Sequence, residues 1–453
     1  MKFIFLSKLV MAMSGSLCLA ATLIPHSSLP AEDLPVVVHP HPFNNKAHTI
    51  YQMNGKAAPI PAEAEMQWLS KSWPEGNAQM PYMVWMPERK ELLMMVECKQ
   101  PIRSAFIRST DGGKTWSDRT WLRNGTDGEI GLGLGLVYLG DGKVRAVWGD
   151  RQNVEWSSDD YGANWISRVE AEPKKDILYF WDQAYVLEEG TKEKPARLIE
   201  AGHRSHGTYG QKGFYSQASV RFSDDGGKTW SPEQVVPQWK GVNEVTFVRA
   251  ANGDLVAGCR VDYPEKLLGT NTELDSDGGL AVSISSDEGK TWSPINYLYE
   301  WGRHHPCLVK MPNNDLLMTY VVRKGYTPNE AGYPRHGIEA VISKDNGKTW
   351  DLDHRVVLAS YEGNLKGIPH RDWFCSVQST STVLLPDQTL LTAFGTGFKN
   401  VQNTPVCQMD VALIRWKLPT NTLNNDRDLA QAAYDSELRN VHVPILSPVN
   451  KGE

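Results

Sequence analysis

The sequence predicts an all-β protein, a six-bladed β-propeller, from a repeated octapeptide and from the spacing of its copies. The pattern Ser-x-Asp-x-Gly-x-x-Trp begins at Ser109, Ser158, Ser223, Ser285 and Ser343. Successive copies start about 50 to 65 residues apart. A repeat of that length can hold the four short strands of one propeller blade, so we expect such units to be arranged around one axis.

The octapeptide itself predicts a hairpin. In the first copy Asp111 and two glycines form the turn, and Trp116 ends the motif. An Asp carboxylate in such a turn caps backbone amides, and the indole packs against a neighbouring sheet. Each copy is therefore expected to close one sheet.

Six units can be counted along the chain. Each has an opening strand and a second, apolar strand, for example Glu91 to Val96 in the first unit. The third unit holds a longer insertion around His206, and the sixth ends at Trp416 without an octapeptide. The units open, in order, near Met80, Gly131, Trp181, Asn243, His304 and Ser376.

The propeller is expected at 78–418, between a leader and a tail. Residues 1–21 begin with Met-Lys and continue as an apolar run that ends in small residues, which is typical of a secretory signal peptide. A leader rich in Pro and Ala (22–77) is expected to pack across the propeller or to close its last blade. The tail (419–453) is expected to hold one helix. We therefore expect a secreted or periplasmic protein.

The composition argues against several classes of function. The formal net charge is −6 and no basic run is present, so a nucleic-acid partner is not expected. After the signal peptide no apolar run is long enough to span a bilayer. The remaining cysteines show no Cys-x-x-Cys spacing, so neither a zinc site nor a disulfide framework is indicated. We expect a monomer without cofactor or metal that handles a glycan.

Strand ends at the centre of a propeller supply the candidate site residues. The opening of each first strand and the exit of each second strand converge at one mouth of the central channel. The guanidinium groups at these positions could grip a carboxylate with paired hydrogen bonds. The alternative is that the strand-end charges are solvated or pair with one another. The openings include Gln79, Asp182, Glu244 and His304, and the exits include Glu97, His203, Arg260 and Arg323.

The octapeptides resemble the Asp-box repeats of the sialidase (neuraminidase) superfamily, and the resemblance covers roughly residues 79–417. It implies a six-bladed propeller with its Asp boxes at the blade periphery. It also implies a secreted, exo-acting glycoside hydrolase that acts on a terminal, acidic sugar. In that family three Arg residues clamp the substrate carboxylate, a Tyr with a Glu as its base is the nucleophile, and an Asp is the general acid and base.

Several residues match these family positions. The resemblance implies that Glu244 is the base, that Arg260 is the second clamp Arg, and that Arg335 is the third. Glu97 resembles the family's Glu at the end of the long strand of the first blade. Arg323 and His203 join the expected substrate-binding set by their position at strand exits.

Three family roles have no match. Gln79 stands where the first clamp Arg is expected, and Ser379 stands where the nucleophilic Tyr is expected. No Asp occurs between Cys98 and Arg108 to act as the general acid. A non-catalytic, glycan-binding propeller is therefore the alternative function.

Other residues could replace the missing groups. Arg371 and Asp372 precede the sixth unit, and His304 and His305 open the fifth. Imidazoles and carboxylates can do acid and base work, so Asp372 and His304 join Glu244 as candidate catalytic residues, and Arg371 joins the binding set. Adjacent His residues in a strand point to opposite faces, so only one of this pair is expected to face the channel.

Two further alternatives remain open. Tyr263 and Tyr333 lie close to the matched arginines and could replace the lost phenol. A metal-dependent enzyme is a third class of function, although no closely spaced motif such as His-x-x-x-His is present. Its ligands would come from His203, His304, His305 and His370.

Overall fold

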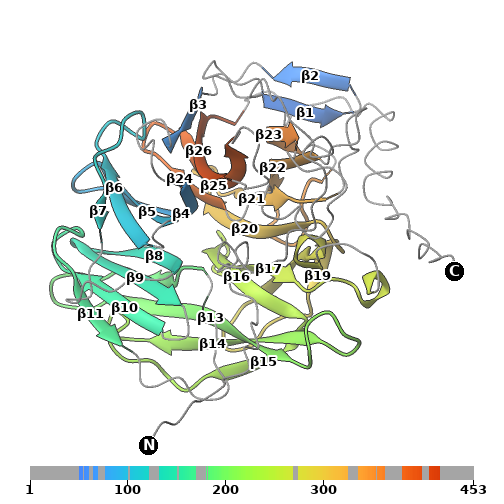
Figure 1. Cartoon of the computed structure of the whole chain (residues 1–453). Helices are drawn as coiled ribbons and strands as arrows, with labels where there is room; N and C mark the ends of the chain where they lie inside the picture. Colours follow the sequence, from blue (N-terminus) through green and yellow to red (C-terminus); the bar gives the residue numbers. More distant parts are fainter. Residues whose placement is uncertain are drawn as a thin grey trace, which may run out of the picture.

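The computed structural model describes residues 50–54, 56–60, 65–69, 77–99, 103–121, 132–149, 153–169, 180, 182–268, 274–324, 335–352, 355–362, 380–399 and 408–418. Within these ranges the strands form six antiparallel sheets. The sheets surround one axis as the blades of a propeller (Figure 1). The predicted all-β, six-bladed propeller is therefore confirmed.

The first four blades are four-stranded meanders. Blade I contains β4 (Asn77–Met86), β5 (Glu91–Lys99), β6 (Arg103–Ser109) and β7 (Thr120–Trp121). Blade II contains β8 (Leu132–Gly140), β9 (Lys143–Gly149), β10 (Asn153–Ser158) and β11 (Ile166–Val169). Blade III contains β12 (Tyr185–Glu188), β13 (Arg197–His206), β14 (Tyr215–Ser223) and β15 (Gln234–Lys240). Blade IV contains β16 (Val242–Arg249), β17 (Leu255–Val261), β18 (Gly279–Ser285) and β19 (Asn296–Tyr299), with the short 3₁₀ helices η4 (Glu265–Leu267) and η5 (Leu274–Asp277) between β17 and β18.

The last two blades recruit strands from the beginning of the chain. Blade V contains β20 (Arg303–Lys310), β21 (Leu316–Val322), β22 (Arg335–Ser343) and β23 (Val356–Glu362), extended by β1 (Ile50–Asn54) and β2 (Lys56–Ile60). Blade VI contains β24 (Thr380–Leu384), β25 (Leu390–Lys399) and β26 (Gln408–Trp416), and its fourth strand is β3 (Glu65–Trp68). Because β3 precedes blade I in the sequence, its pairing with β26 ties the two ends of the propeller together.

The octapeptides form the capped turns that the sequence predicts. In the first copy, Asp111 Oδ1 accepts hydrogen bonds from the backbone N–H groups of Lys114 and Thr115, both at 3.0 Å, and the Ser109 hydroxyl accepts one from Gly113 N at 2.8 Å. The other four copies repeat this pattern. Burial raises the pKa of Asp111, but its hydrogen bonds outweigh burial and lower the pKa to about 2.

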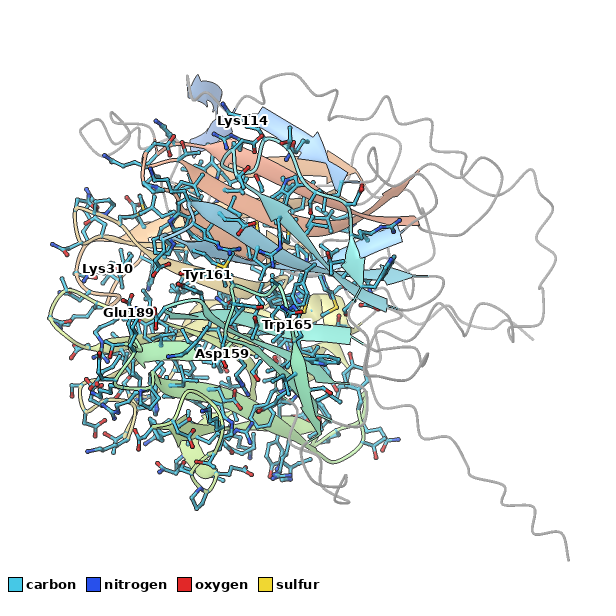
Figure 2. The ribbon with its side chains drawn as sticks, turned by 90° about the vertical axis from the view of Figure 1, so that its left-hand side faces the viewer. Lys114, Asp159, Tyr161, Trp165, Glu189 and Lys310 are labelled. Atoms are coloured by element: carbon cyan, nitrogen blue, oxygen red, sulfur yellow. The ribbon has the colours of Figure 1, made fainter. Side chains whose placement is uncertain are left out.

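The octapeptides also pack against the preceding blade. Trp165, labelled in Figure 2, stacks on Phe106 of blade I with ring centroids 4.4 Å apart. In the fifth copy, Gly347 has φ +85°, and a Cβ added there would lie 2.7 Å from Val256 of blade IV. The expected packing of the indole on a neighbouring sheet is confirmed for Trp165, and the glycine of the fifth copy allows the same close approach.

The hydrophobic core lies between the blades. One cluster joins blade III to blade IV through Ile199, Trp239, Phe247 and Trp292. The other five clusters each join one further pair of adjacent blades. This packing fixes the blades relative to one another, and it therefore holds the inner strand ends in place.

Two sequence expectations concern cysteines and membranes. Cys259 and Cys307 are free and buried. No helix in the described ranges is long and apolar enough to cross a bilayer. The predicted signal peptide and the helix predicted in the tail (419–453) lie outside the described residues.

Candidate functional site

Irregular first strands set the direction of the candidate side chains. The register shifts near the start of β4, β16 and β20. In β4 and β20 a residue takes the left-handed backbone conformation, with φ of 50° at Met80 and 53° at His305. Such bulges re-aim side chains that would otherwise alternate between two faces. The ring centroids of His304 and His305 are therefore only 4.5 Å apart, and the expectation that the two side chains point to opposite faces is wrong.

Glu244 lies in the middle of an ion-pair network at the start of β16. Its Oε1 accepts a hydrogen bond from Arg260 Nη1 at 2.7 Å, and its Oε2 is 2.6 Å from His305 Nδ1. Burial raises the pKa of Glu244, but the charge of Arg260 and the contact with His305 outweigh burial and lower the pKa to about 2. Glu244 is therefore ionised at neutral pH.

A second carboxylate, Asp275, connects Arg260 to Arg323. It lies in η5, and its two oxygens accept hydrogen bonds from Arg260 Nη2 and from Arg323 Nη1. Burial raises the pKa of Asp275, but the two guanidinium charges hold it well below its usual range. Sequence reasoning did not select Asp275, because it lies in a connection that shows neither a repeat nor strand periodicity.

His305 fits this network as a neutral imidazole. Its Nε2 lies 3.5 Å from Arg260 Nη1 and 3.4 Å from Arg323 Nη2. Guanidinium nitrogens only donate hydrogen bonds, so Nε2 is placed to accept and Nδ1–H to donate to Glu244. Burial lowers the pKa of His305, and although Glu244 opposes this, the net shift is downward. The side chain therefore carries no charge in the network.

Asp182 opens blade III and interacts electrostatically with Glu244 and Arg260 of the same network. Its φ of 86° and the hydrogen bond from its N–H to Leu134 O at 2.9 Å hold it between blades II and III. Burial and the negative charge of Glu244 raise the pKa of Asp182 well above its usual value, although Arg260 opposes this shift. Asp182 and Glu244 are thus two carboxyl groups whose pKa values are moved in opposite directions, an arrangement typical of acid and base pairs.

Two further histidines are buried beside these groups. Burial lowers the pKa of His304 well below its usual value and the pKa of His203 to about 4. Glu244 and Arg260 both influence His203, so the structure brings this residue to the network. His304 is fully buried, whereas the side chain of His305 is 12% exposed and contacts Glu244 directly. The catalytic role predicted for His304 stays a prediction.

Gln79 and Glu97 form a separate buried pair in blade I. Gln79 Nε2 donates a hydrogen bond to Glu97 Oε2 at 2.7 Å. Tyr82, which the sequence analysis did not select, interacts electrostatically with Glu97 of this pair and with Glu244. Burial raises the pKa of Tyr82 well above its usual value, and the negative charges of Asp182, Glu244 and Glu97 add to this shift. The predicted substrate-binding roles of Gln79 and Glu97 stay predictions.

Other predicted site residues lie at the limits of the described structure. Arg335 is the first residue of β22 and pairs in register with Glu362, and its predicted role as a clamp Arg stays a prediction. Three further candidates lie outside the described ranges, and their roles stay predictions: Arg371, Asp372 and Tyr333.

Three aromatic residues, Tyr209, Phe214 and Tyr263, form a cluster that interacts with Arg260 through Tyr209. The Tyr263 hydroxyl accepts a hydrogen bond from Gly210 N at 2.9 Å, and its ring stacks on Phe214 and meets Tyr209 edge-on. Tyr209 interacts electrostatically with Arg260. Within the described ranges, no group of three or more His, Cys, Asp or Glu side chains could hold a metal ion. His370, a ligand of the metal alternative, lies outside them.

Comparison with known proteins begins with the repeats. The family described as BNR/Asp-box repeat matches residues 107–118 and 221–232. A sialidase from Bacteroides fragilis (strain YCH46) is 24% identical over 311 residues, which are 59% of this chain and 51% of the relative. A sialidase from Clostridium perfringens is 26% identical over 237 residues, which are 45% of this chain and 56% of the relative. The chain therefore spans about half the length of these two curated relatives.

A solved structure shares the fold. A protein of unknown function from Dyadobacter fermentans DSM 18053 superimposes with a TM-score of 0.53 at 15% identity, over 75% of this chain and 95% of that chain. This likeness concerns the fold alone. The Asp boxes, the six blades and the similarity to two sialidases together support the resemblance of this chain to the sialidase superfamily.

Proposed function

We propose that this protein is an exo-acting glycoside hydrolase that removes a terminal sugar from a glycan. The observation that carries the proposal is the buried carboxylate of Glu244, which Arg260 Nη1 at 2.7 Å and His305 Nδ1 at 2.6 Å hold in place. Glu244 also interacts electrostatically with Asp182, and the pKa values of the two carboxyl groups are shifted in opposite directions. Hydrolysis of a glycoside by two carboxyl groups needs one that is protonated and one that is ionised at neutral pH. The similarity to curated sialidases supports the same class of reaction.

The two carboxyl groups take different roles in this proposal. Asp182 gives its proton to the glycosidic oxygen as the bond from that oxygen to the anomeric carbon breaks. Glu244 has a pKa of about 2 and is therefore a weak proton acceptor, so it stabilises the positive charge that develops at the anomeric carbon. Water then adds its hydroxyl to the sugar, and its other proton returns to Asp182.

The remaining groups of the network position Glu244. Arg260 and His305 each hold one of its oxygens, which fixes the carboxylate plane before substrate arrives.

The signal peptide predicted in residues 1–21 supports export as part of the proposal. Amino-terminal sequencing of protein recovered outside the cytoplasm tests this part, and retention of residues 1–21 would contradict it.

Activity is tested with the purified protein on a panel of aryl glycosides that covers neutral and acidic sugars. We expect turnover of at least one, and a loss of kcat/KM of about 100-fold or more for Asp182→Asn and for Glu244→Gln. Asp224→Asn is the matched control. Asp224 lies in the octapeptide turn of blade III, its side chain is 81% exposed, and it pairs with Arg197 of β13. A folded wild-type protein that turns over no member of the panel would contradict the proposal.

Glycan binding without catalysis is the second candidate function. It is favoured by the engagement of both oxygens of Glu244, which leaves that carboxylate little freedom to take part in a reaction. Titration calorimetry with the parent sugars separates the two candidates. Measurable affinity without release of the aryl alcohol supports the binding function, whereas turnover that depends on Asp182 supports the hydrolase.

A further inference from the structure

The two arginines of the site are bound to carboxylates of their own chain. Arg260 donates to Glu244 through Nη1 and to Asp275 through Nη2. Arg323 donates to Asp275 through Nη1. With one oxygen on each guanidinium group, Asp275 takes the bridging position that an arginine pair offers to a bound carboxylate.

The charges of this network are balanced. Arg260 and Arg323 supply two positive charges. Glu244 and Asp275 supply two negative charges, since the arginines lower the pKa of both carboxyl groups. His305 adds none, because its Nε2 faces guanidinium donors and has to accept. Among the described residues, these four charged groups therefore leave no excess positive charge in the network with which to attract an anion.

Solvent reaches this network mainly at Asp275. Its side chain is 26% exposed, compared with 10% for Arg260 and 3% for Arg323. The carboxylate of Asp275 is therefore more accessible to a ligand from solvent than either guanidinium group. A ligand carboxylate is repelled at this position, whereas a sugar hydroxyl can donate a hydrogen bond to it.

We propose that Asp275 is a specificity-determining residue that fills the anion position between Arg260 and Arg323 and restricts the site to neutral sugars. The inference rests on the proposed glycoside hydrolase function, whose substrate class it names. It differs from the acidic sugar that the resemblance to sialidases implies. The reason for the different substrate class is the carboxylate of Asp275, which occupies the position between the two arginines that a substrate carboxylate would take.

The test measures binding rather than turnover. Titration calorimetry compares glucuronic acid with glucuronamide, and N-acetylneuraminic acid with its amide, because the members of each pair differ in charge and are otherwise close in shape. The wild-type protein is expected to favour the amide by at least about 10-fold. Asp275→Ala removes the acceptor of Arg260 Nη2 and Arg323 Nη1 and is expected to shift the ratio toward the acid by about 10- to 100-fold, the range of a charged hydrogen bond.

Two further variants make the comparison specific. Asp275→Asn keeps the size of the side chain and removes its charge, so it is expected to relieve the repulsion and to shift the ratio less than Asp275→Ala does. It also carries the test if Asp275→Ala fails to fold in a thermal melt. Glu265→Gln is the matched control, since it removes one exposed negative charge from η4 in the same connection and is expected to leave the ratio unchanged.

The outcomes separate this inference from the proposed function. Equal affinity of the wild-type protein for acid and amide, or a ratio that both Asp275 variants leave unchanged, overturns the role of Asp275. If the wild-type protein binds neither member, Asp275→Ala has to gain affinity for an acid, and its failure to do so also overturns the role. Turnover with a preference for acidic glycosides refutes the specificity and leaves the hydrolase standing. If the wild-type protein prefers the amide, Asp275→Ala prefers the acid and neither protein turns over a glycoside, the hydrolase function is refuted and the role of Asp275 in specificity is supported.

Discussion

Arg260 and Glu244 form a buried ion pair, with 2.7 Å between Nη1 and Oε1, that joins the adjacent strands β17 and β16 of blade IV. At this position the strand-end charges pair with one another, which is the alternative that the sequence analysis set beside ligand binding. Because Arg260 also contacts Asp275, one guanidinium group donates hydrogen bonds to two carboxylates.

Arg260→Ala is expected to lower the free energy of unfolding by about 3–5 kcal/mol, because it leaves the buried carboxylate of Glu244 without a counter-charge. Urea melts followed by tryptophan fluorescence measure the loss. Arg204→Ala is the matched control, since its ion pair with Glu233 is more exposed, at 32% and 23%. A pair of that kind contributes about 0–1 kcal/mol. Equally small losses for the two variants would contradict a structural role for Arg260.

The protonation of His305 gives a second prediction. The ring is expected to be neutral at pH 7, with its proton on Nδ1, because Nε2 faces Arg260 and Arg323 and Nδ1 faces Glu244. Nitrogen-15 spectra of the imidazole groups report the tautomer, and His305→Gln assigns the signal. A ring that carries protons on both nitrogens, or on Nε2 alone, would show that the network is arranged differently.

The fold could be predicted because its signals are local in the sequence. Ser109 and Asp111 form their turn with residues that are at most four positions away, and the same short motif recurs in five blades. Blade closure by β3 was only one of two roles expected for the leader, because no motif in residues 65–68 marks their pairing with β26.

The candidate site could be predicted only in part. Glu244, Arg260 and Arg323 were selected from their positions at strand ends, and the structure brings them into one network. Asp275 was missed because its place between two arginines depends on the path of an irregular connection. The neighbouring rings of His304 and His305 were missed because the bulge in β20 breaks the alternation that a regular strand would have.

Acidification is expected to destabilise the protein between about pH 6.5 and 4. Burial lowers the folded-state pKa of His203 and of His336 from 6.5 to about 4. In this window the unfolded chain binds more protons than the folded chain, so the free energy of unfolding falls as the pH falls. Glu244 continues the loss from pH 4.5 toward 2.

Asp182 contributes with the opposite sign. Its pKa is raised in the folded state, so its contribution is present at low pH and is lost as the pH rises through the folded pKa. Urea melts at pH 4, 5, 6 and 7 measure the sum. Because several histidines have lowered pKa values, a free energy of unfolding that stays constant or increases from pH 7 to pH 4 would contradict the prediction.

The contact between the fifth octapeptide and blade IV is tested by Gly347→Ala. A Cβ at Gly347 would lie 2.7 Å from Val256 Cγ2 and 2.8 Å from Cγ1, and Val256 is fully buried in β17 and too short to move aside. Gly253→Ala is the matched control, because φ is +93° there, close to the +85° of Gly347, and no atom lies within 4 Å of the added Cβ. Both variants carry a backbone strain of about 1–2 kcal/mol, and overpacking adds about 1–3 kcal/mol for Gly347→Ala alone.

A double-mutant cycle then assigns the added cost to that one contact. Val256→Ala removes both methyl groups that the new Cβ of Gly347→Ala would meet, so the doubly substituted protein is expected to be more stable than the sum of the two single losses predicts. The expected coupling is about 1 kcal/mol or more, measured by urea melts of the four proteins. Additive losses would mean that the octapeptide can shift away from blade IV, and equal losses for Gly347→Ala and Gly253→Ala would mean that the close approach contributes nothing to the packing of the blades.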